Sequence, residues 1–201
     1  MKRTILLIVS FFVLNVVLAQ EKMILTLKNG EKKEGVYKIK LPQYGLSAFK
    51  IVGHKNREKY GLKDIDKVLI IKDSNKYWFE VIDTKKYVDS KKSKLKFGQV
   101  IYKGKHISVF ETVETIYSGS VGGGFIVQSN SNYQNSYAKK TNDTYAFNIG
   151  YIYGAAQKGI KKRIRSYFSE CPSLVSAVEN KLIDKKDVKS IVLFYENNCS
   201  H

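Results

Sequence analysis

The spacing of apolar residues changes twice along this chain. Residues 4–18 form an almost continuous apolar run, residues 23–153 alternate apolar and polar side chains, and the residues from 155 onward repeat apolar side chains at helical spacing. A period of two is typical of strands with one face in a core, whereas intervals of three and four indicate amphipathic helices. The pattern predicts an α+β fold, with an antiparallel β-sheet or open barrel followed by a C-terminal three-helix unit.

Short predicted strands follow one another through the middle of the chain, separated by Gly, Asn, Asp, Ser and Lys. The first pair flanks Asn29-Gly30, a dipeptide that favours a type I′ hairpin turn because both residues tolerate a positive φ. No helical segment of ten residues lies between the strands, which argues against a parallel sheet. The alternation predicts strands at 23–28, 33–41, 48–52, 66–72, 76–82, 95–102 and 106–111.

Residues 118–154 differ in composition and are rich in Gly, Ser, Asn and Tyr. We expect a long, partly mobile hairpin here, with residues 124–128 as the outgoing strand and residues 144–153 as the returning strand. These residue types build adaptable binding surfaces, but the same composition also describes a flexible insertion without a ligand. The candidate recognition residues of this hairpin are Tyr133, Tyr137 and Tyr145.

Three helices are expected after the hairpin. In the first, an apolar residue recurs every four positions from Ile160, which gives the helix one apolar stripe. Pro172 suits the first turn of the second helix, where its missing N–H leaves no hydrogen bond unmade. Asp184, followed three residues later by Asp187, indicates the start of the third helix.

The apolar run at the N-terminus has the layout of an export signal. Lys2 and Arg3 precede it, and it ends in Val17-Leu18-Ala19, whose small last residue suits a signal peptidase. As a membrane anchor the run is short of the roughly 20 residues that span hydrocarbon. We therefore predict an exported protein, periplasmic or at the outer surface or extracellular. Its predicted parts are a signal peptide at 1–19, an antiparallel β domain at 20–117, the hairpin at 118–154 and the helical unit at 155–201.

Cys171 and Cys199 are the two cysteines of the chain. In an oxidising compartment an even number of cysteines favours pairing, so we expect one disulfide. The bridge would join the end of the first predicted helix to the end of the third. Two thiols without a nearby histidine do not supply the four ligands of zinc, so we expect no metal site, and no cofactor is predicted.

The chain is strongly basic, with a formal net charge of +17. In an exported protein this charge favours an envelope protein, anionic lipids or acidic polymers as partners over nucleic acid, although it also describes a solvated surface that keeps the protein soluble. The densest basic cluster lies on the first predicted helix, whose apolar stripe either packs on the other helices or dips into a membrane surface. The candidate residues for anionic-surface binding are Lys161, Lys162, Arg163 and Arg165.

No catalytic constellation stands out in the sequence. Ser120 lies in a Gly-rich segment, but the residue two before it is Ser118, and a predicted strand follows where a nucleophile elbow requires a helix. The three histidines, His54, His106 and His201, have no metal ligand at a suitable spacing. We therefore predict a non-enzymatic binding or structural module for a protein or an acidic surface polymer. The alternative is a hydrolase that acts on envelope material with a site assembled from scattered residues.

Parts of the chain resemble known sequences. The segment Leu-Lys-Asn-Gly-Glu lies at 27–31, and the tail contains Tyr-Phe-Ser-Glu-Cys-Pro-Ser-Leu at 167–174 and Ile-Val-Leu-Phe-Tyr-Glu-Asn-Asn-Cys at 191–199. Together with a signal that ends in Leu-Ala-Gln, these segments resemble uncharacterised exported proteins of Bacteroidetes bacteria. The resemblance implies a periplasmic or outer-surface location in a diderm bacterium and paired tail cysteines. It transfers no catalytic or binding residue.

Overall fold

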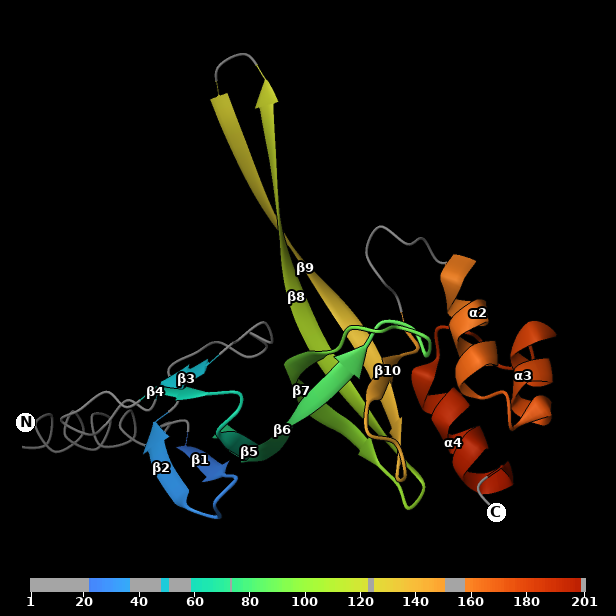
Figure 1. The fold of residues 1–201 in the computed structure, drawn as a ribbon, viewed down its shortest axis with the longest axis horizontal. Coiled ribbons are helices and arrows are strands. Elements are labelled where there is room, and N and C mark those ends of the chain that lie inside the picture. The colour runs from blue at the N-terminus through green and yellow to red at the C-terminus, as the bar shows by residue number, and fades with distance from the viewer. Residues whose placement is uncertain are drawn as a thin grey trace, which may run out of the picture. The chain divides into compact units, whose positions relative to one another are not determined.

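The computed structural model describes residues 22–36, 48–50, 59–72, 74–122, 125–150 and 158–199. These residues form an α+β fold in which an eight-stranded, mostly antiparallel sheet is followed by three C-terminal helices, as predicted (Figure 1). The strand order is β10-β9-β8-β7-β6-β5-β1-β2. The described residues before Phe79 belong to one compact unit, and those from Phe79 onward belong to a second.

The first unit is built from paired antiparallel strands. A central strand, β1, has β2 on one side and β5 on the other, and two further short strands, β3 and β4, pair separately. Alternate residues of β1 are buried because every second side chain of a strand points to the same face. The strands are β1 (Lys22–Leu27), β2 (Lys32–Val36), β3 (Ala48–Lys50), β4 (Lys59–Gly61) and β5 (Ile65–Lys72).

The turn between β1 and β2 is not the predicted type I′ turn. Gly30 has a φ of +86°, and it is the one residue of this turn with a positive φ. Its N–H donates to the Leu27 carbonyl oxygen at 2.9 Å. Asn29 instead uses its side-chain Oδ1 to accept a hydrogen bond from the Glu31 N–H at 3.0 Å. Gly30 alone adopts the left-handed conformation in this turn. The Asn29 side chain supplies the acceptor for the Glu31 amide.

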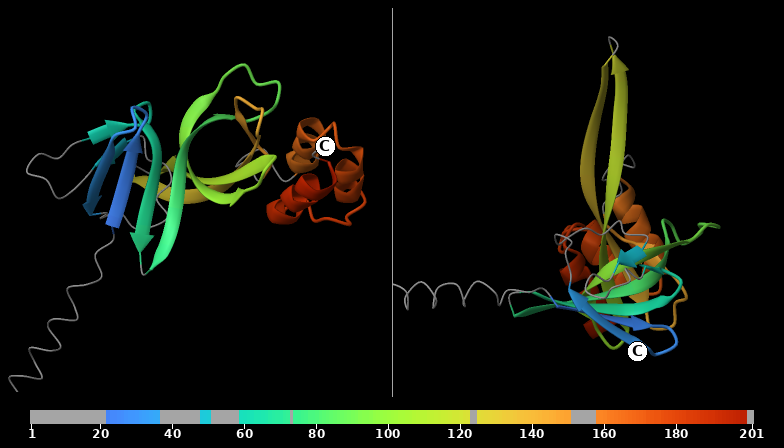
Figure 2. Two further views of the ribbon diagram at one scale, coloured as in Figure 1. Left: turned by 90° about the horizontal axis from the view of Figure 1, so that it is seen from below. Right: turned by 90° about the vertical axis from the view of Figure 1, so that its left-hand side faces the viewer.

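In the second unit, four strands form a meander and a fifth closes it. β10 pairs antiparallel with β9 and parallel with β6, so the strands β6 to β10 return to their starting point and form a small barrel (Figure 2). Such closure leaves fewer unpaired backbone groups than an open sheet. The strands are β6 (Asn75–Lys85), β7 (Lys94–Lys103), β8 (Ile107–Gly122), β9 (Phe125–Lys140) and β10 (Ala146–Asn148).

The long hairpin lies earlier in the chain than predicted. β8 and β9 pair along their whole length, so the described part of the predicted outgoing strand, residues 125–128, lies at the start of the returning strand. Within residues 144–153, the described strand is the short β10. The predicted unit boundary at residue 118 falls inside β8. The polar Ser, Asn and Gln residues that indicated a loop belong to β9, because a β-ladder is held by backbone groups whatever the side chains are.

Three helices follow, and the start of the last one differs from the prediction. Asp187 is its N-cap, with its carboxylate accepting from the Ser190 N–H at 3.0 Å and from the Ser190 hydroxyl at 2.7 Å. Asp184, the predicted start, lies before the cap. An acidic N-cap satisfies a first-turn amide that has no partner within the helix. The helices are α2 (Lys158–Tyr167), α3 (Pro172–Glu179) and α4 (Val188–Asn198).

The helices bury their apolar faces against the strands β8 and β9 and against one another. The most deeply buried side chains of this core include Phe168, Leu174 and Ile191. Cys171 and Cys199 are paired at disulfide distance, as predicted, with Cα atoms 5.6 Å apart. Closing a loop of 28 residues restricts the unfolded chain by about 3.5 kcal/mol on the entropic model. Among the described residues, no helix is both long and apolar enough for a membrane span.

We predict that Leu174→Ala lowers the free energy of unfolding by about 3 kcal/mol, because it leaves a cavity where a fully buried side chain stood. Leu182→Ala is the matched control, since Leu182 is 80% exposed, and it should change stability by less than about 0.5 kcal/mol. Urea unfolding monitored by circular dichroism measures both. Equal effects of the two substitutions would contradict the packing described for α3.

Candidate functional site

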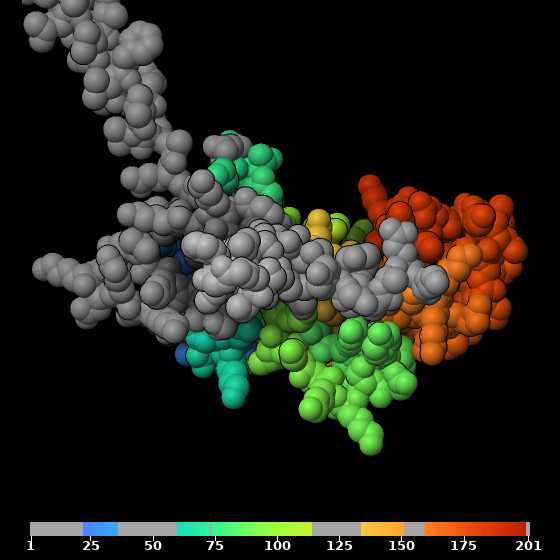
Figure 3. Space-filling model, turned by 90° about the horizontal axis from the view of Figure 1, so that it is seen from above, coloured from blue at the N-terminus to red at the C-terminus, as the bar shows by residue number. Residues whose placement is uncertain are grey.

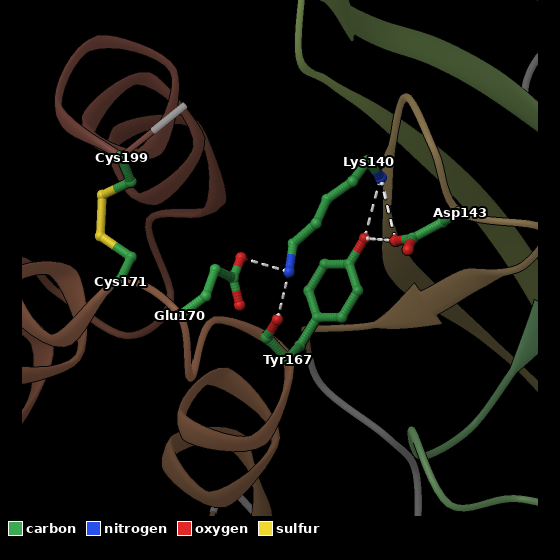
Figure 4. A network of polar contacts seen from close by, with 6 residues as sticks. All are labelled: Lys140, Asp143, Tyr167, Glu170, Cys171 and Cys199. Carbon is green, nitrogen blue, oxygen red and sulfur yellow. Dashed lines mark hydrogen bonds and ion pairs between the residues drawn. A yellow bond between two sulfur atoms is a disulfide. The ribbon is translucent and has the colours of Figure 1, made fainter. Parts of the chain in front are cut away.

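A polar network around Lys140 ties the end of β9 to the end of α2 (Figure 4). The Lys140 ammonium forms an ion pair with Glu170 and donates to the Tyr167 carbonyl oxygen at 2.6 Å. The Lys140 backbone N–H donates to the Tyr167 hydroxyl oxygen at 2.9 Å, and that hydroxyl donates to Asp143. The network therefore fixes the position of α2 on the barrel.

Two phenols and one carboxyl group beside Lys140 have shifted pKa values. Burial raises the pKa of Tyr167 well above its usual value, and the hydrogen bond to Asp143 adds to that effect. Burial also raises the pKa of Tyr195 to about 12, with the Glu170 charge as the next cause. Burial opposes ionisation of Glu170, but the hydrogen bond from Lys140 leaves the pKa of that carboxyl below its usual value. A proton transfer site needs a group whose pKa lies near the working pH, and these shifts move the pKa values away from neutrality. The network therefore suits a structural role.

The last helix is anchored to the barrel by a carboxylate. Glu196 of α4 accepts from the Lys105 N–H at 2.6 Å and from the His106 N–H at 3.0 Å. These amides lie in the β7–β8 connection, which also contains Gly104. A Cβ on Gly104 would lie 2.6 Å from Glu196 Oε2, so a larger residue here would push the carboxylate from its present position. This contact and the Lys140 network hold the helices on the barrel at two places.

A pocket of about 470 Å³ lies beside α2 in this second unit. Its walls come from the segment between β6 and β7, from β10 and from α2. In the space-filling view the green surface of the β6–β7 segment lies next to the orange surface of the first helix (Figure 3). The lining residues combine aromatic rings with polar and charged groups: Tyr87, Val88, Asp89, Phe147, Asn148, Gly159, Lys162, Arg163, Ser166 and Tyr167.

Arg163 is the unusual residue of this lining, because its guanidinium is buried without a counterion. The residue is 4% exposed, and its Nη2 donates to the Gly150 carbonyl oxygen. Nε and Nη1 have no hydrogen-bond partner, and no carboxylate in the described residues forms an ion pair with this side chain. Gly159, one turn earlier, makes room for the group, since a Cβ there would lie 2.7 Å from Nη1.

This burial is costly for a cation. Loss of water contact lowers the pKa of Arg163, and the neighbouring Tyr87 and Tyr137 act in the opposite direction. An arginine still remains charged at neutral pH because its ordinary pKa is above 12. Buried donors nearly always have partners in folded proteins, and an uncompensated buried charge destabilises the fold. A pocket with such a group is therefore suited to an anion brought by a ligand.

Buried amide groups hold the one acceptor that Arg163 has. The Gly150 N–H donates to Asn148 Oδ1 at 3.1 Å, and Asn148 Nδ2 lies 3.4 Å from Asn135 Oδ1. Both asparagines are buried, on β10 and β9. The position of the guanidinium is thus set by backbone and side chains of two adjacent strands before any ligand binds.

The predicted basic cluster is divided by the structure. Arg165 is exposed and pairs with Glu179, while the Lys161 ammonium donates to the Glu179 carbonyl oxygen at 3.1 Å. Lys162 and Arg163 instead line the pocket. The four side chains therefore do not share one exposed face, because Arg163 points into the protein where the helix meets the barrel.

The candidate tyrosines are divided as well. Tyr137 is a buried residue of β9 whose hydroxyl accepts from the Lys96 ammonium at 2.7 Å. Tyr145 lies under the Lys85 ammonium, which is 4.1 Å from its ring centre. Tyr133 is in β9, but its side chain lies outside the described part of the chain. No local sequence pattern marks the pocket residue Tyr87, because its neighbours in the pocket come from distant parts of the chain.

The described part of the chain shows neither a metal site nor a catalytic serine site. Those residues contain no group of three His, Cys, Asp or Glu side chains that would hold a metal ion. His54 and His201 lie outside the described ranges. Ser118 and Ser120 lie in β8, and their side chains also fall outside the description. The pocket beside Arg163 is thus the strongest candidate site.

Comparisons with known proteins do not assign the chain to a family. No family model matches the chain, and no curated protein and no solved structure shows significant similarity to it.

We predict that Arg163→Met raises the free energy of unfolding by about 1–3 kcal/mol, because it replaces an uncompensated buried charge with an apolar side chain of similar length. Arg165→Met, two residues along the same helix, removes the same charge from an exposed ion pair and should change stability by no more than about 1 kcal/mol. Urea unfolding without added anions measures both. A strong destabilisation by Arg163→Met would show that the guanidinium serves the fold.

Proposed function

We propose that this protein is an exported, non-enzymatic binding module of the cell envelope, which takes an anionic group of its ligand into the pocket beside Arg163. The observation that supports this proposal is the buried guanidinium with two unpartnered nitrogens. The positive charge in this pocket has no counterion, so an anion that binds there gains an ion pair and hydrogen bonds. Hydrogen bonds to a charged group contribute about 1.5–3 kcal/mol each.

The composition of the pocket favours binding over catalysis. Asp89 is the one carboxylate among the described lining residues, whereas glycoside hydrolysis uses a pair of acids across the substrate. Ser166 lines the pocket too, but none of the lining residues that the structure describes is a histidine that could activate it. The hydrolase alternative therefore lacks a supporting observation in the described residues.

Export is supported by two observations. The N-terminal segment has the layout of a signal peptide, although it lies outside the described residues. The pairing of Cys171 with Cys199 is compatible with an oxidising compartment. The proposed location is the periplasm, the outer surface or the extracellular space of a diderm bacterium, as the resemblance to exported proteins of Bacteroidetes implies.

An acidic surface polymer is the proposed class of ligand. Without Lys2 and Arg3 of the signal peptide, which contains no acidic residue, the formal net charge falls from +17 to +15, and it would still attract any polyanion to the protein. Lys162 is exposed and lines the pocket together with Arg163, so a second positive charge stands at the same site. The long-range charge brings the polymer to the surface, and the pocket would hold one of its anionic groups.

Substitution of the pocket arginine tests this proposal. We predict that Arg163→Met lowers the affinity for a heparin oligosaccharide by about 10-fold or more, measured by calorimetric titration at constant salt. Arg165→Met removes an equal charge outside the pocket and should lower the affinity by less than about 3-fold. Equal losses in the two variants would mean that net charge alone attracts the polymer, and the pocket would have no role.

Export is tested by intact mass. We predict that protein recovered from the periplasm or medium of a diderm host begins at Gln20 and gains no mass on alkylation unless it is first reduced. The first result reports cleavage after Ala19, and the second reports the disulfide. Full-length protein with two alkylated thiols, recovered from the cytosol, would contradict the proposed location.

A further inference from the structure

The residues around Arg163 indicate which kind of anion fits the pocket. The lining has three aromatic side chains, Tyr87, Phe147 and Tyr167, and these give it flat apolar surface. Tyr87 is 38% exposed, while Phe147 is half-buried. A ligand that fits here carries an apolar face as well as a negative charge. Inorganic anions have no such face.

The polar groups of the lining add a second requirement. Asp89 is exposed and accepts hydrogen bonds but cannot donate them while ionised. It therefore repels a second negative charge on the ligand and favours hydroxyl groups. The Ser166 hydroxyl can both donate and accept, so it too suits a hydroxylated ligand. A ligand that fits the pocket therefore combines one anionic group, several hydroxyl groups and an apolar face.

A phosphate group meets these requirements poorly. It carries up to two negative charges near neutral pH and is bound in proteins by several donors together. Here one guanidinium and the Lys162 ammonium face it, and Asp89 opposes the second charge. A carboxylate carries one charge and matches a single guanidinium. The charge balance of the lining therefore favours a carboxylate.

We infer that the pocket binds a uronic acid residue of an acidic polysaccharide. Its carboxylate lies toward Arg163, one face of the sugar ring lies against Tyr87, and its hydroxyls bond Asp89 and Ser166. This inference rests on the proposed function of the same pocket. A volume of about 470 Å³ falls within the range of ligand pockets and is sufficient for a sugar unit. Because Nε and Nη1 of Arg163 are buried, the side chains around them must shift for the carboxylate to reach them.

The segment that carries Tyr87 supplies charge for neighbouring sugar units. Lys86, Lys91 and Lys92 are exposed in the connection from β6 to β7, which forms one wall of the pocket. A polymer with one uronate in the pocket would place its adjoining carboxylates near these ammonium groups. Their contribution is screened by salt, whereas that of the buried Arg163 is screened much less.

The test is a calorimetric titration of the purified, disulfide-bonded protein with tetrasaccharides of galacturonic, glucuronic and mannuronic acid. Each is compared with its methyl ester, which keeps the ring and hydroxyls but removes the charge, and with inorganic phosphate. We expect at least one tetrasaccharide to bind, its ester to bind at least about 10-fold more weakly, and phosphate not to compete. Tyr87→Ala should weaken binding about 3-fold to 10-fold, while Leu182→Ala, a change at an exposed residue outside the lining, leaves it unchanged.

The outcomes separate this inference from the function on which it rests. Equal binding of an acid and its ester, or no effect of Tyr87→Ala, would overturn the sugar assignment. Binding of phosphate that depends on Arg163, without binding of any uronate, would overturn the sugar assignment and leave the anion pocket intact. If neither phosphate nor any uronate binds, both the inference and the proposed function fail.

Discussion

Burial of the apolar helix faces on the barrel is the interaction on which the rest of the second unit depends. Polar contacts fix the helices at two places on the barrel. Lys140 binds the end of α2, and Glu196 anchors α4 to the β7–β8 connection. The disulfide then joins the start of α3 to the end of α4. Apolar burial supplies the free energy, and the polar contacts determine how each helix lies on the barrel.

The same packing explains why a charge lies inside the protein. Arg163 directly precedes Ile164, a fully buried residue of the apolar stripe, so a helix that buries this stripe against the barrel brings Arg163 inward with it. The fold tolerates the charge because Gly159 leaves space and Gly150 offers one acceptor. It leaves the other nitrogens unpartnered, and this is a cost to stability that a ligand would offset. Stability and binding are thus linked through one side chain.

Local patterns predicted the elements well and the site poorly. Strand alternation and the four-residue repeat from Ile160 depend on neighbouring residues, and they located most strands and the three helices. The pairing of β9 with β8 was missed because its polar residues resemble a loop, while its hydrogen bonds come from the backbone. Whether Arg163 faces water or the barrel depends on the rotation of α2, which is a tertiary property. Gly159, four residues before Arg163, was the one local sign of a close approach.

The most direct test of a buried guanidinium that awaits an anion is the NMR signal of the Arg163 Nε–H, assigned by its loss in Arg163→Met. Our prediction is a signal that exchanges slowly with water in the free protein and shifts when a uronate tetrasaccharide is added, while the signal of the exposed Arg165 stays in place. An Arg163 signal that exchanges as fast as that of Arg165, or one that does not move when the ligand binds, would contradict it.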